Sequence, residues 1–109
     1  MAKYHKGLVG GRWNKLTLSE QMANVGSEIG RTIKWKNQKD EHSRAAFYRA
    51  LELLNLTIAD PKNKHGAKEL CRAREMLVDW FLGNPEYEST DRQWNKYFLQ
   101  FNYAARANR

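Results

Sequence analysis

The chain has 109 residues, 41% of them hydrophobic and 28% charged. This composition is typical of one globular domain, and the chain is too short for two independent cores. Nineteen Lys and Arg residues against twelve Asp and Glu residues give a net charge of +7, which favours polyanionic partners such as nucleic acids. No stretch approaches the roughly 18 apolar residues of a membrane-spanning helix. The first six residues lead into no apolar secretory signal, so we expect a cytoplasmic protein without a membrane role.

The first predicted helix begins at Thr17 and runs to about Asn37. Thr17 and Glu20 match the capping box, in which each side chain accepts a backbone N–H at the start of the helix. Apolar residues then recur every three or four positions, as on one face of an α-helix. They are Leu18, Met22, Val25, Ile29 and Ile33.

Two further helices are predicted between residues 41 and 83. The buried face of the second helix is Phe47, Ala50, Leu51, Leu54 and Ile58. It ends at Asp60-Pro61, because the residue before a proline avoids the α conformation. Residues 62–66 are expected to form a short basic loop. The third helix carries Leu70, Ala73, Leu77 and Phe81, and Gly83-Asn84-Pro85 ends it in the order expected for a C-terminus.

The last predicted helix starts at a second capping-box match, Thr90 with Gln93. Its apolar face is the most aromatic in the chain: Trp94, Tyr97, Phe98, Phe101 and Ala105. No segment alternates apolar and polar residues as a β-strand does. The sequence therefore predicts an all-α protein, an antiparallel up-down four-helix bundle over residues 15–109, preceded by a flexible basic arm over residues 1–14.

Basic residues are expected to gather at one pole of this bundle, where the first and third helices start and the chain ends. The predicted phosphate contacts are Arg12, Lys15, Lys62, Lys64, Lys68, Arg72 and Arg106, with Arg109 and His65 nearby and Glu69 as the main opposing acid. Trp13 is the expected aromatic residue for stacking on an unpaired base. The alternative is a basic surface that is only solvated. The opposite pole mixes both signs of charge.

Four residues are candidates for a protein interface. Gly26 and Gly30 lie one helical turn apart, and glycine costs a helix about 1 kcal/mol relative to alanine, so a close packing contact is expected there. That contact is either inside the bundle or with a second protomer. Trp35 and Trp80 either pack at the edge of the core or anchor a partner, since Trp is favoured at interfaces.

No catalytic, metal or cofactor motif is present. Neither His42 nor His65 follows a Glu by three residues, as a di-iron bundle requires, and the chain lacks a glycine-rich phosphate loop. The single cysteine, Cys71, excludes an intrachain disulfide and is interpreted as a small buried residue rather than a nucleophile. We therefore expect no enzyme activity and no cofactor.

The region from Trp13 to Ala107 resembles small, uncharacterised helical proteins that recur among bacteria. The features that carry this resemblance are Leu18-Ser19-Glu20-Gln21, Gly26-Ser27-Glu28, Arg49-Ala50-Leu51-Glu52-Leu53, Ala59-Asp60-Pro61, Arg74-Glu75 and Tyr97-Phe98 with Phe101. In size, helix number and basicity the chain is also similar to the four-helix proteins of ribosomal RNA intervening sequences. In the same features it resembles the accessory variability proteins of diversity-generating retroelements. This resemblance implies a ring-like oligomer that engages a reverse transcriptase and its RNA.

Two functions are therefore predicted as alternatives. The first is a noncatalytic accessory subunit, oligomeric, that binds nucleic acid, RNA rather than DNA, and supports a reverse transcriptase or another nucleic-acid enzyme. The second is a protein–protein adaptor or oligomeric scaffold without a nucleic-acid role, which would use Gly26, Gly30, Trp35 and Trp80.

Overall fold

The computed structural model describes residues 11–36, 38–83 and 90–107, and the regular structure of these residues is entirely helical. Four long helices follow one another: α2 (Leu18–Trp35), α3 (Asp40–Ala59), α4 (Ala67–Leu82) and α5 (Asp91–Ala107). A short helix, α1 (Gly11–Asn14), precedes them, and the 3-10 helix η2 (Pro61–Gly66) joins α3 to α4. The prediction of an all-α protein is confirmed.

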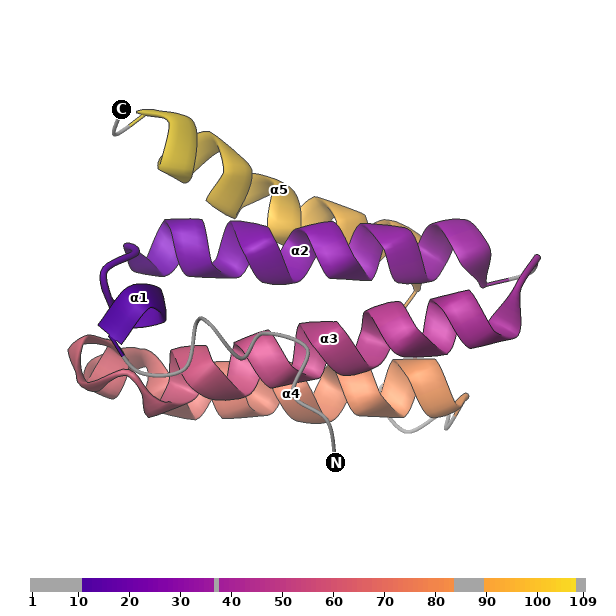
Figure 1. Ribbon diagram of the computed structural model, residues 1–109, viewed down its shortest axis with the longest axis horizontal. Coiled ribbons are helices and arrows are strands. Elements are labelled where there is room, and N and C mark those ends of the chain that lie inside the picture. The colour runs from indigo at the N-terminus through magenta and orange to yellow at the C-terminus, as the bar shows by residue number, and fades with distance from the viewer. Residues whose placement is uncertain (1–10, 37, 84–89, 108–109) are drawn as a thin grey trace.

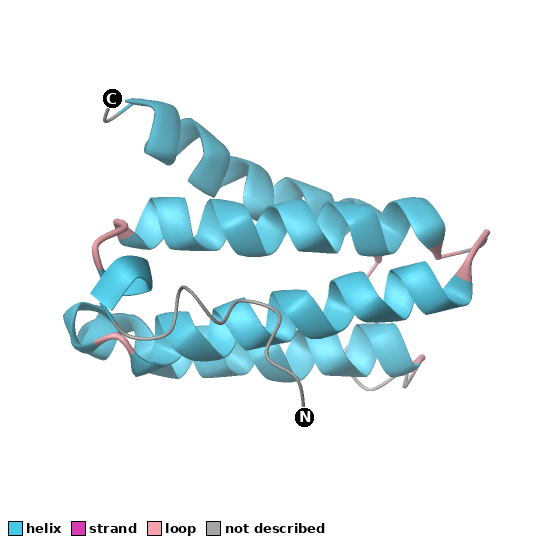
Figure 2. Cartoon of the chain, viewed as in Figure 1, coloured by secondary structure: helices cyan, strands magenta, loops and turns pink. Residues whose placement is uncertain are grey.

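The long helices lie side by side, and each runs in the opposite direction to the one before it (Figure 1). Helix α2 packs along α3 on one side and α5 on the other, and α4 lies against α3. Helix α5 diverges from α2 toward its C-terminal end. The starts of α2 and α4, the whole of η2 and the end of α5 consequently share one end of the molecule, with few loop residues among those described (Figure 2).

The predicted helix boundaries at capping residues are confirmed. At the start of α2, the Glu20 backbone N–H donates to Thr17 Oγ1 at 3.1 Å, and the Thr17 N–H donates to Glu20 Oε1 at 2.9 Å. Thr90 and Gln93 make the same reciprocal pair before α5, at 3.1 and 2.8 Å. Helix α4 ends at Gly83, whose φ of 76° lies in the left-handed region that glycine adopts without steric cost.

The core combines the predicted apolar faces with several aromatic rings. Phe47 on α3 stacks on Phe81 of α4, with ring centroids 4.1 Å apart, and Trp80 lies 6.4 Å from Trp94 of α5. The fully buried side chains include Met22, Val25, Ile29, Leu54 and Leu77. Contacts between rings therefore join α3, α4 and α5 at the end opposite η2.

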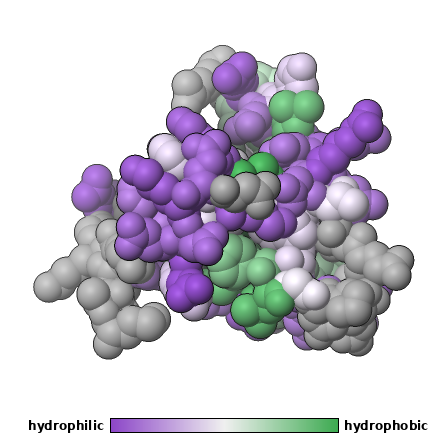
Figure 3. Space-filling model, turned by 90° about the vertical axis from the view of Figure 1, so that its right-hand side faces the viewer, coloured by the Kyte–Doolittle hydropathy of each residue, from purple (hydrophilic) through white to green (hydrophobic). Residues whose placement is uncertain are grey.

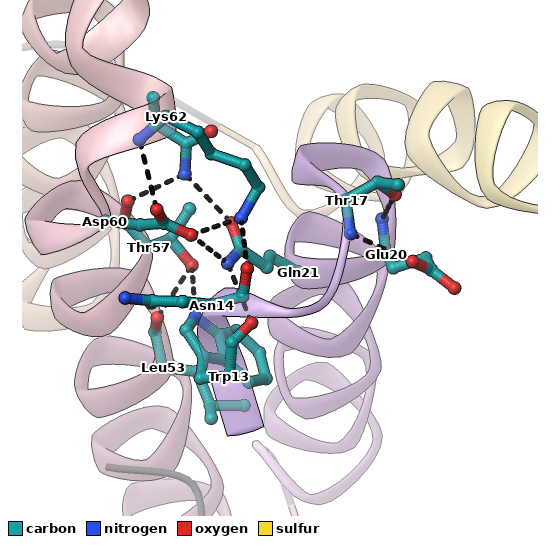
Figure 4. Close-up of polar contacts among 10 residues, drawn as sticks. Trp13, Asn14, Thr17, Glu20, Gln21, Leu53, Thr57, Asp60 and Lys62 are labelled. Atoms are coloured by element: carbon teal, nitrogen blue, oxygen red, sulfur yellow. Dashed lines mark hydrogen bonds and ion pairs between the residues drawn. The ribbon is translucent and has the colours of Figure 1, made fainter. Parts of the chain in front are cut away.

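Residues 11–14 are part of the folded domain and not of a flexible arm, which corrects the prediction for this portion of residues 1–14. They form α1, and Trp13 is only 1% exposed. Its indole N–H donates to Thr57 Oγ1 on α3 at 3.2 Å, and its backbone carbonyl accepts from the Gln21 side chain of α2 at 3.0 Å (Figure 4). Residues 1–10 lie outside the described residues.

Residues 62–66 also depart from the prediction of a loop, because they form η2. Asp60 caps this helix by accepting the Lys62 backbone N–H at 3.1 Å, and Pro61 follows at the first position, where an N–H would have no partner. Buried Asn63 donates to Gln21 Oε1 and to the Thr57 carbonyl, both at 2.9 Å. The buried side chains of Asp60 and Asn63 therefore hold the turn after α3 in place.

The side chain of Asp60 is the centre of this polar cluster, although it is only 3% exposed (Figure 4). It accepts from Gln21 Nε2 at 2.8 Å and forms a close ion pair with the Lys62 ammonium. Burial by itself would raise the pKa of the Asp60 carboxyl. Hydrogen bonds from the Lys62 ammonium, the Gln21 amide and the Lys62 backbone N–H outweigh burial and hold the pKa below its ordinary value of 3.8. We call Trp13, Gln21, Thr57, Asp60, Lys62 and Asn63 the buried polar junction.

The first prediction concerns the Asp60 carboxylate. Because its pKa is lowered by folding, its contribution to stability is present above the ordinary pKa and is lost as pH falls through the lower pKa of the folded state. Replacing Asp60 with Asn should lower the free energy of unfolding at neutral pH by about 2 kcal/mol. The difference between wild type and Asp60→Asn should shrink in urea unfolding curves recorded toward about pH 2. Glu75→Gln, at an exposed carboxylate on α4, is the control. A difference that stays constant with pH would contradict the prediction.

The second prediction compares two glycines of α2. A Cβ added at Gly26 would lie 2.8 Å from Phe98 Cβ of α5, whereas nothing lies within 4 Å of one added at Gly30. Gly26→Ala should therefore lower the free energy of unfolding by about 1 kcal/mol or more, because α5 must move away. Gly30→Ala should raise it by up to about 1 kcal/mol through helix propensity. Thermal unfolding of both variants tests this, and equal shifts would contradict it.

Candidate nucleic-acid interface

Most of the cations predicted to contact phosphate are exposed and lie at the end that holds α1 and η2 (Figure 1). Helix α1 and the residue after it supply Arg12 and Lys15, η2 supplies Lys64, and the first two turns of α4 supply Lys68 and Arg72. These segments are in direct contact, because the Lys62 ammonium donates to the Asn14 carbonyl at 3.1 Å. None of these cations forms an ion pair with another described residue.

Arg106 lies in the last turn of α5, at the same end of the molecule but on the helix that diverges. It is exposed, like the other cations. We call Arg12, Lys15, Lys64, Lys68, Arg72 and Arg106 the basic end. Among the described residues, the acids nearest in sequence are Glu20, which caps α2, Asp60, which is paired with Lys62, and Glu69 and Glu75 on α4.

Lys62 differs from the other predicted phosphate contacts. Its ammonium is held between the Asp60 carboxylate and the Asn14 carbonyl, so its charge is used inside the protein. Its structural task is to attach the end of α1 to η2. We therefore exclude Lys62 from the basic end.

Trp13 does not have the predicted role, and the prediction that it stacks on bases is wrong. Its ring is 1% exposed, and its N–H is bonded to Thr57. A base could reach it only if α1 left the domain. The sequence predicts an arm over residues 1–14 because this glycine-rich segment has little hydrophobic periodicity. One large buried aromatic ring, Trp13, is nevertheless enough to attach a single helical turn to the core.

The exposed face of α5 carries a stripe that the sequence patterns above do not identify. Arg92, Lys96, Leu99, Tyr103 and Arg106 follow one another at spacings of three and four residues, which places them on one side of the helix. Leu99 is 50% exposed and Tyr103 is 68% exposed. Arg92, Lys96 and Leu99 line a groove of about 560 Å³ between α5 and α2. The same periodicity that predicts a buried face would have found this stripe if it had been applied to the exposed residues.

The opposite end has a different electrostatic character. The Lys36 ammonium lies 3.0 Å from Asp91 Oδ1, which also accepts the Trp80 indole N–H at 2.8 Å. Figure 3 looks onto this end, where hydrophilic side chains surround a hydrophobic patch. Leu82, the last residue of α4, is 73% exposed there. At this end the Lys36 charge is therefore paired with a carboxylate, whereas the cations of the basic end form no ion pair with a described residue.

The four residues predicted to form a protein interface are placed differently from one another. Gly26 faces Phe98 of α5, so its close contact is inside the chain, whereas Gly30 is exposed. Trp80 is 6% exposed and does not form an external anchor, because its ring is buried and its N–H is bonded to Asp91. Trp35 is half-buried, with its ring edge against His42 at 5.4 Å.

The described residues hold neither a cluster of metal ligands nor a helix that could span a membrane. No cluster of three or more His, Cys, Asp or Glu side chains that could hold a metal ion occurs among them. None of the helices in this part of the chain has the length and apolar character required to cross a membrane. Cys71 is half-buried and does not fill the core as completely as predicted.

A comparison with protein-family models, curated proteins and solved structures finds no match for this chain.

The placement of Trp13 gives the third prediction. Trp13→Phe keeps an aromatic ring but removes the donor to Thr57, so the free energy of unfolding should fall by about 1–2 kcal/mol. Thr57→Val, which removes the acceptor, should cause a similar loss, and the double variant should lose less than the sum of the two. Urea unfolding measures all three. Strict additivity would show that this hydrogen bond does not couple α1 to α3.

Proposed function

We propose that this protein is a noncatalytic RNA-binding subunit whose basic end contacts the phosphate backbone. The observation that carries the proposal is the group of exposed cations from α1, η2 and α4, which have no carboxylate partner among the described residues. A cation that is not already paired is free to replace the counterions of a phosphate. The release of those counterions drives binding and makes it weaken with salt.

The positions of these cations favour a single binding surface over scattered charges. Lys64, Lys68 and Arg72 follow one another along η2 and α4, and the contact between Lys62 and Asn14 places Arg12 and Lys15 beside them. Helices hold all of these side chains except Lys15, which directly follows α1, so little backbone order has to be gained on binding. RNA is favoured over DNA because single strands and loops allow bases to be contacted as well as phosphates.

The proposal extends to the architecture and to the partners. We propose an antiparallel up-down four-helix bundle that acts as an oligomeric accessory subunit and presents RNA to an enzyme formed by another chain. A reverse transcriptase is the partner suggested by the similarity in size, helix number and basicity to retroelement accessory proteins. Copies that assemble side by side would multiply the basic end and raise the affinity for a long RNA.

A protein–protein adaptor is the second candidate function, and the stripe on α5 favours it. Leu99 and Tyr103 are exposed between Arg92, Lys96 and Arg106. An apolar centre with a charged rim is the usual composition of a protein interface. The partner that fits would be a helix or surface with an apolar centre and acidic residues around it. Arg106 belongs to both surfaces, so replacing only Arg92, Lys96, Leu99 and Tyr103 separates this function from RNA binding.

The fourth prediction tests the basic end by charge reversal. Lys15→Glu, Lys64→Glu and Lys68→Glu combined should weaken binding of a labelled single-stranded RNA by more than about tenfold at moderate salt. The slope of log affinity against log salt should become less steep, by about 0.7 for each phosphate that the variant no longer neutralises. Fluorescence anisotropy at about 50 mM and about 200 mM salt measures both quantities.

The matched control changes the net charge by the same amount at the other end of the molecule. It combines Lys34→Glu, Lys39→Glu and Arg44→Glu, which lie at the end of α2 and the start of α3. The control should retain most of the affinity. Equal losses in both triple variants would show that only the overall charge matters, and a wild-type protein that binds no RNA would favour the adaptor.

A further inference from the structure

A groove lies between α4 and α5, beside the basic end. Its volume is about 440 Å³, and such a volume is within the range of about 300–1,000 Å³ found for small-ligand sites. The lining residues from α4 are Glu69, Arg72, Ala73 and Met76, and those from α5 are Gln93, Trp94 and Tyr97. The two helices are far enough apart here for the groove to form, because α5 packs mainly on α2.

The floor of the groove is aromatic. The rings of Trp94 and Tyr97 meet edge to face, with centroids 5.5 Å apart and planes at 85°. Tyr97 is half-buried, and burial together with the nearby Glu69 carboxylate raises the pKa of its hydroxyl above the ordinary value of 10.0. Tyr97 therefore stays neutral at physiological pH, so it does not repel a phosphate-bearing ligand.

Trp94 carries an unsatisfied polar group. It is 5% exposed, and its buried indole N–H has no hydrogen-bond acceptor among the described residues. Such donors are exceptional in folded proteins, because leaving one unpaired loses the hydrogen bonds that water would supply.

Two charged side chains of opposite sign lie along the α4 side of the groove. Arg72 is exposed and forms no ion pair with a described residue, and Lys68 lies one turn earlier on the same face of α4. Glu69 is also exposed, and its carboxylate can accept hydrogen bonds from ring or amino N–H groups. A ligand with a phosphate on one side and a planar ring bearing N–H donors on the other would match this arrangement.

We propose that the groove between α4 and α5 binds one unpaired nucleobase of the RNA, with the base against the half-buried ring of Tyr97 and its phosphate at Arg72 and Lys68. This inference rests on the proposed function and adds an aromatic site to it, in place of the buried Trp13. Glu69 accepts from the edge of the base and so favours guanine, whose ring and amino N–H donors are adjacent, over uracil, whose one ring N–H on that edge lies between two carbonyls. A phosphate contact alone would not explain an aromatic floor beside the cations.

Photo-crosslinking of the wild-type protein tests this inference without any substitution. The protein is bound to single-stranded RNAs that carry one 6-thioguanosine at successive positions, and each complex is irradiated and then digested. Mass spectrometry should find the modified base attached to Tyr97. Crosslinks confined to residues outside the groove, such as Tyr103 or Tyr48, would overturn the inference.

An affinity measurement complements the crosslinking. Tyr97→Leu keeps an apolar side chain but removes the ring, and should weaken RNA binding by about tenfold, since stacking of a base on an aromatic ring is worth about that much. Tyr97→Phe should retain the wild-type affinity. Tyr48→Leu, at a tyrosine of α3 that is 51% exposed and outside the groove, is the matched control and should also retain it.

The outcomes distinguish failure of this inference from failure of the proposed function. RNA binding that is salt-dependent but unchanged in Tyr97→Leu, without crosslinks in the groove, overturns the base site and leaves the basic end intact. A wild-type protein that binds no RNA overturns both. A second copy that covers Tyr97, detected as a dimer by light scattering with Tyr97 inaccessible to crosslinking, also overturns the base site.

Discussion

The ion pair between Asp60 and Lys62 is the interaction on which the proposed binding surface depends. Asp60 ends α3 and caps η2, and Lys62 extends the same contact to the end of α1. A buried carboxylate is costly unless its oxygens are hydrogen-bonded, and here Lys62 and Gln21 supply the donors. These contacts hold the end of α3, η2 and the end of α1 together. They thereby fix the positions of the neighbouring cations Arg12, Lys15 and Lys64.

The position of Trp13 follows from the same cluster. The Trp13 side chain donates to Thr57 of α3, and the Trp13 backbone carbonyl accepts from Gln21 of α2. Helix α1 is therefore attached to the core through a side chain and through its backbone. Without this attachment, Arg12 and Lys15 would belong to a loose segment, and ordering that segment would cost free energy in the proposed binding of RNA. The buried polar junction thus links a local packing contact to the arrangement of charge at the surface.

The opposite end is held together in a different way, and this difference explains the groove. Rings of α3, α4 and α5 pack there, and Asp91 accepts from both Lys36 and Trp80. From this fixed point α5 follows α2, because the absence of a side chain at Gly26 lets Phe98 approach closely. Helix α5 consequently moves away from α4 toward the basic end. Trp94, Tyr97 and Arg72 line the space left between the two helices.

Local chemistry in the sequence was sufficient to predict the helices and most of their ends. The capping pairs Thr17–Glu20 and Thr90–Gln93, the stop at Gly83 and the all-α class depend on residues close in the chain, so periodicity and capping rules find them. The sequence also predicted that the cations of the basic end lie at one pole, because consecutive helices that run in opposite directions bring distant helix ends together. Other features depend on partners 44 or more residues away, which no local pattern contains. Only the tertiary structure buries Trp13 against Thr57, pairs Lys62 with Asn14, and distinguishes Gly26 from Gly30 by the proximity of Phe98.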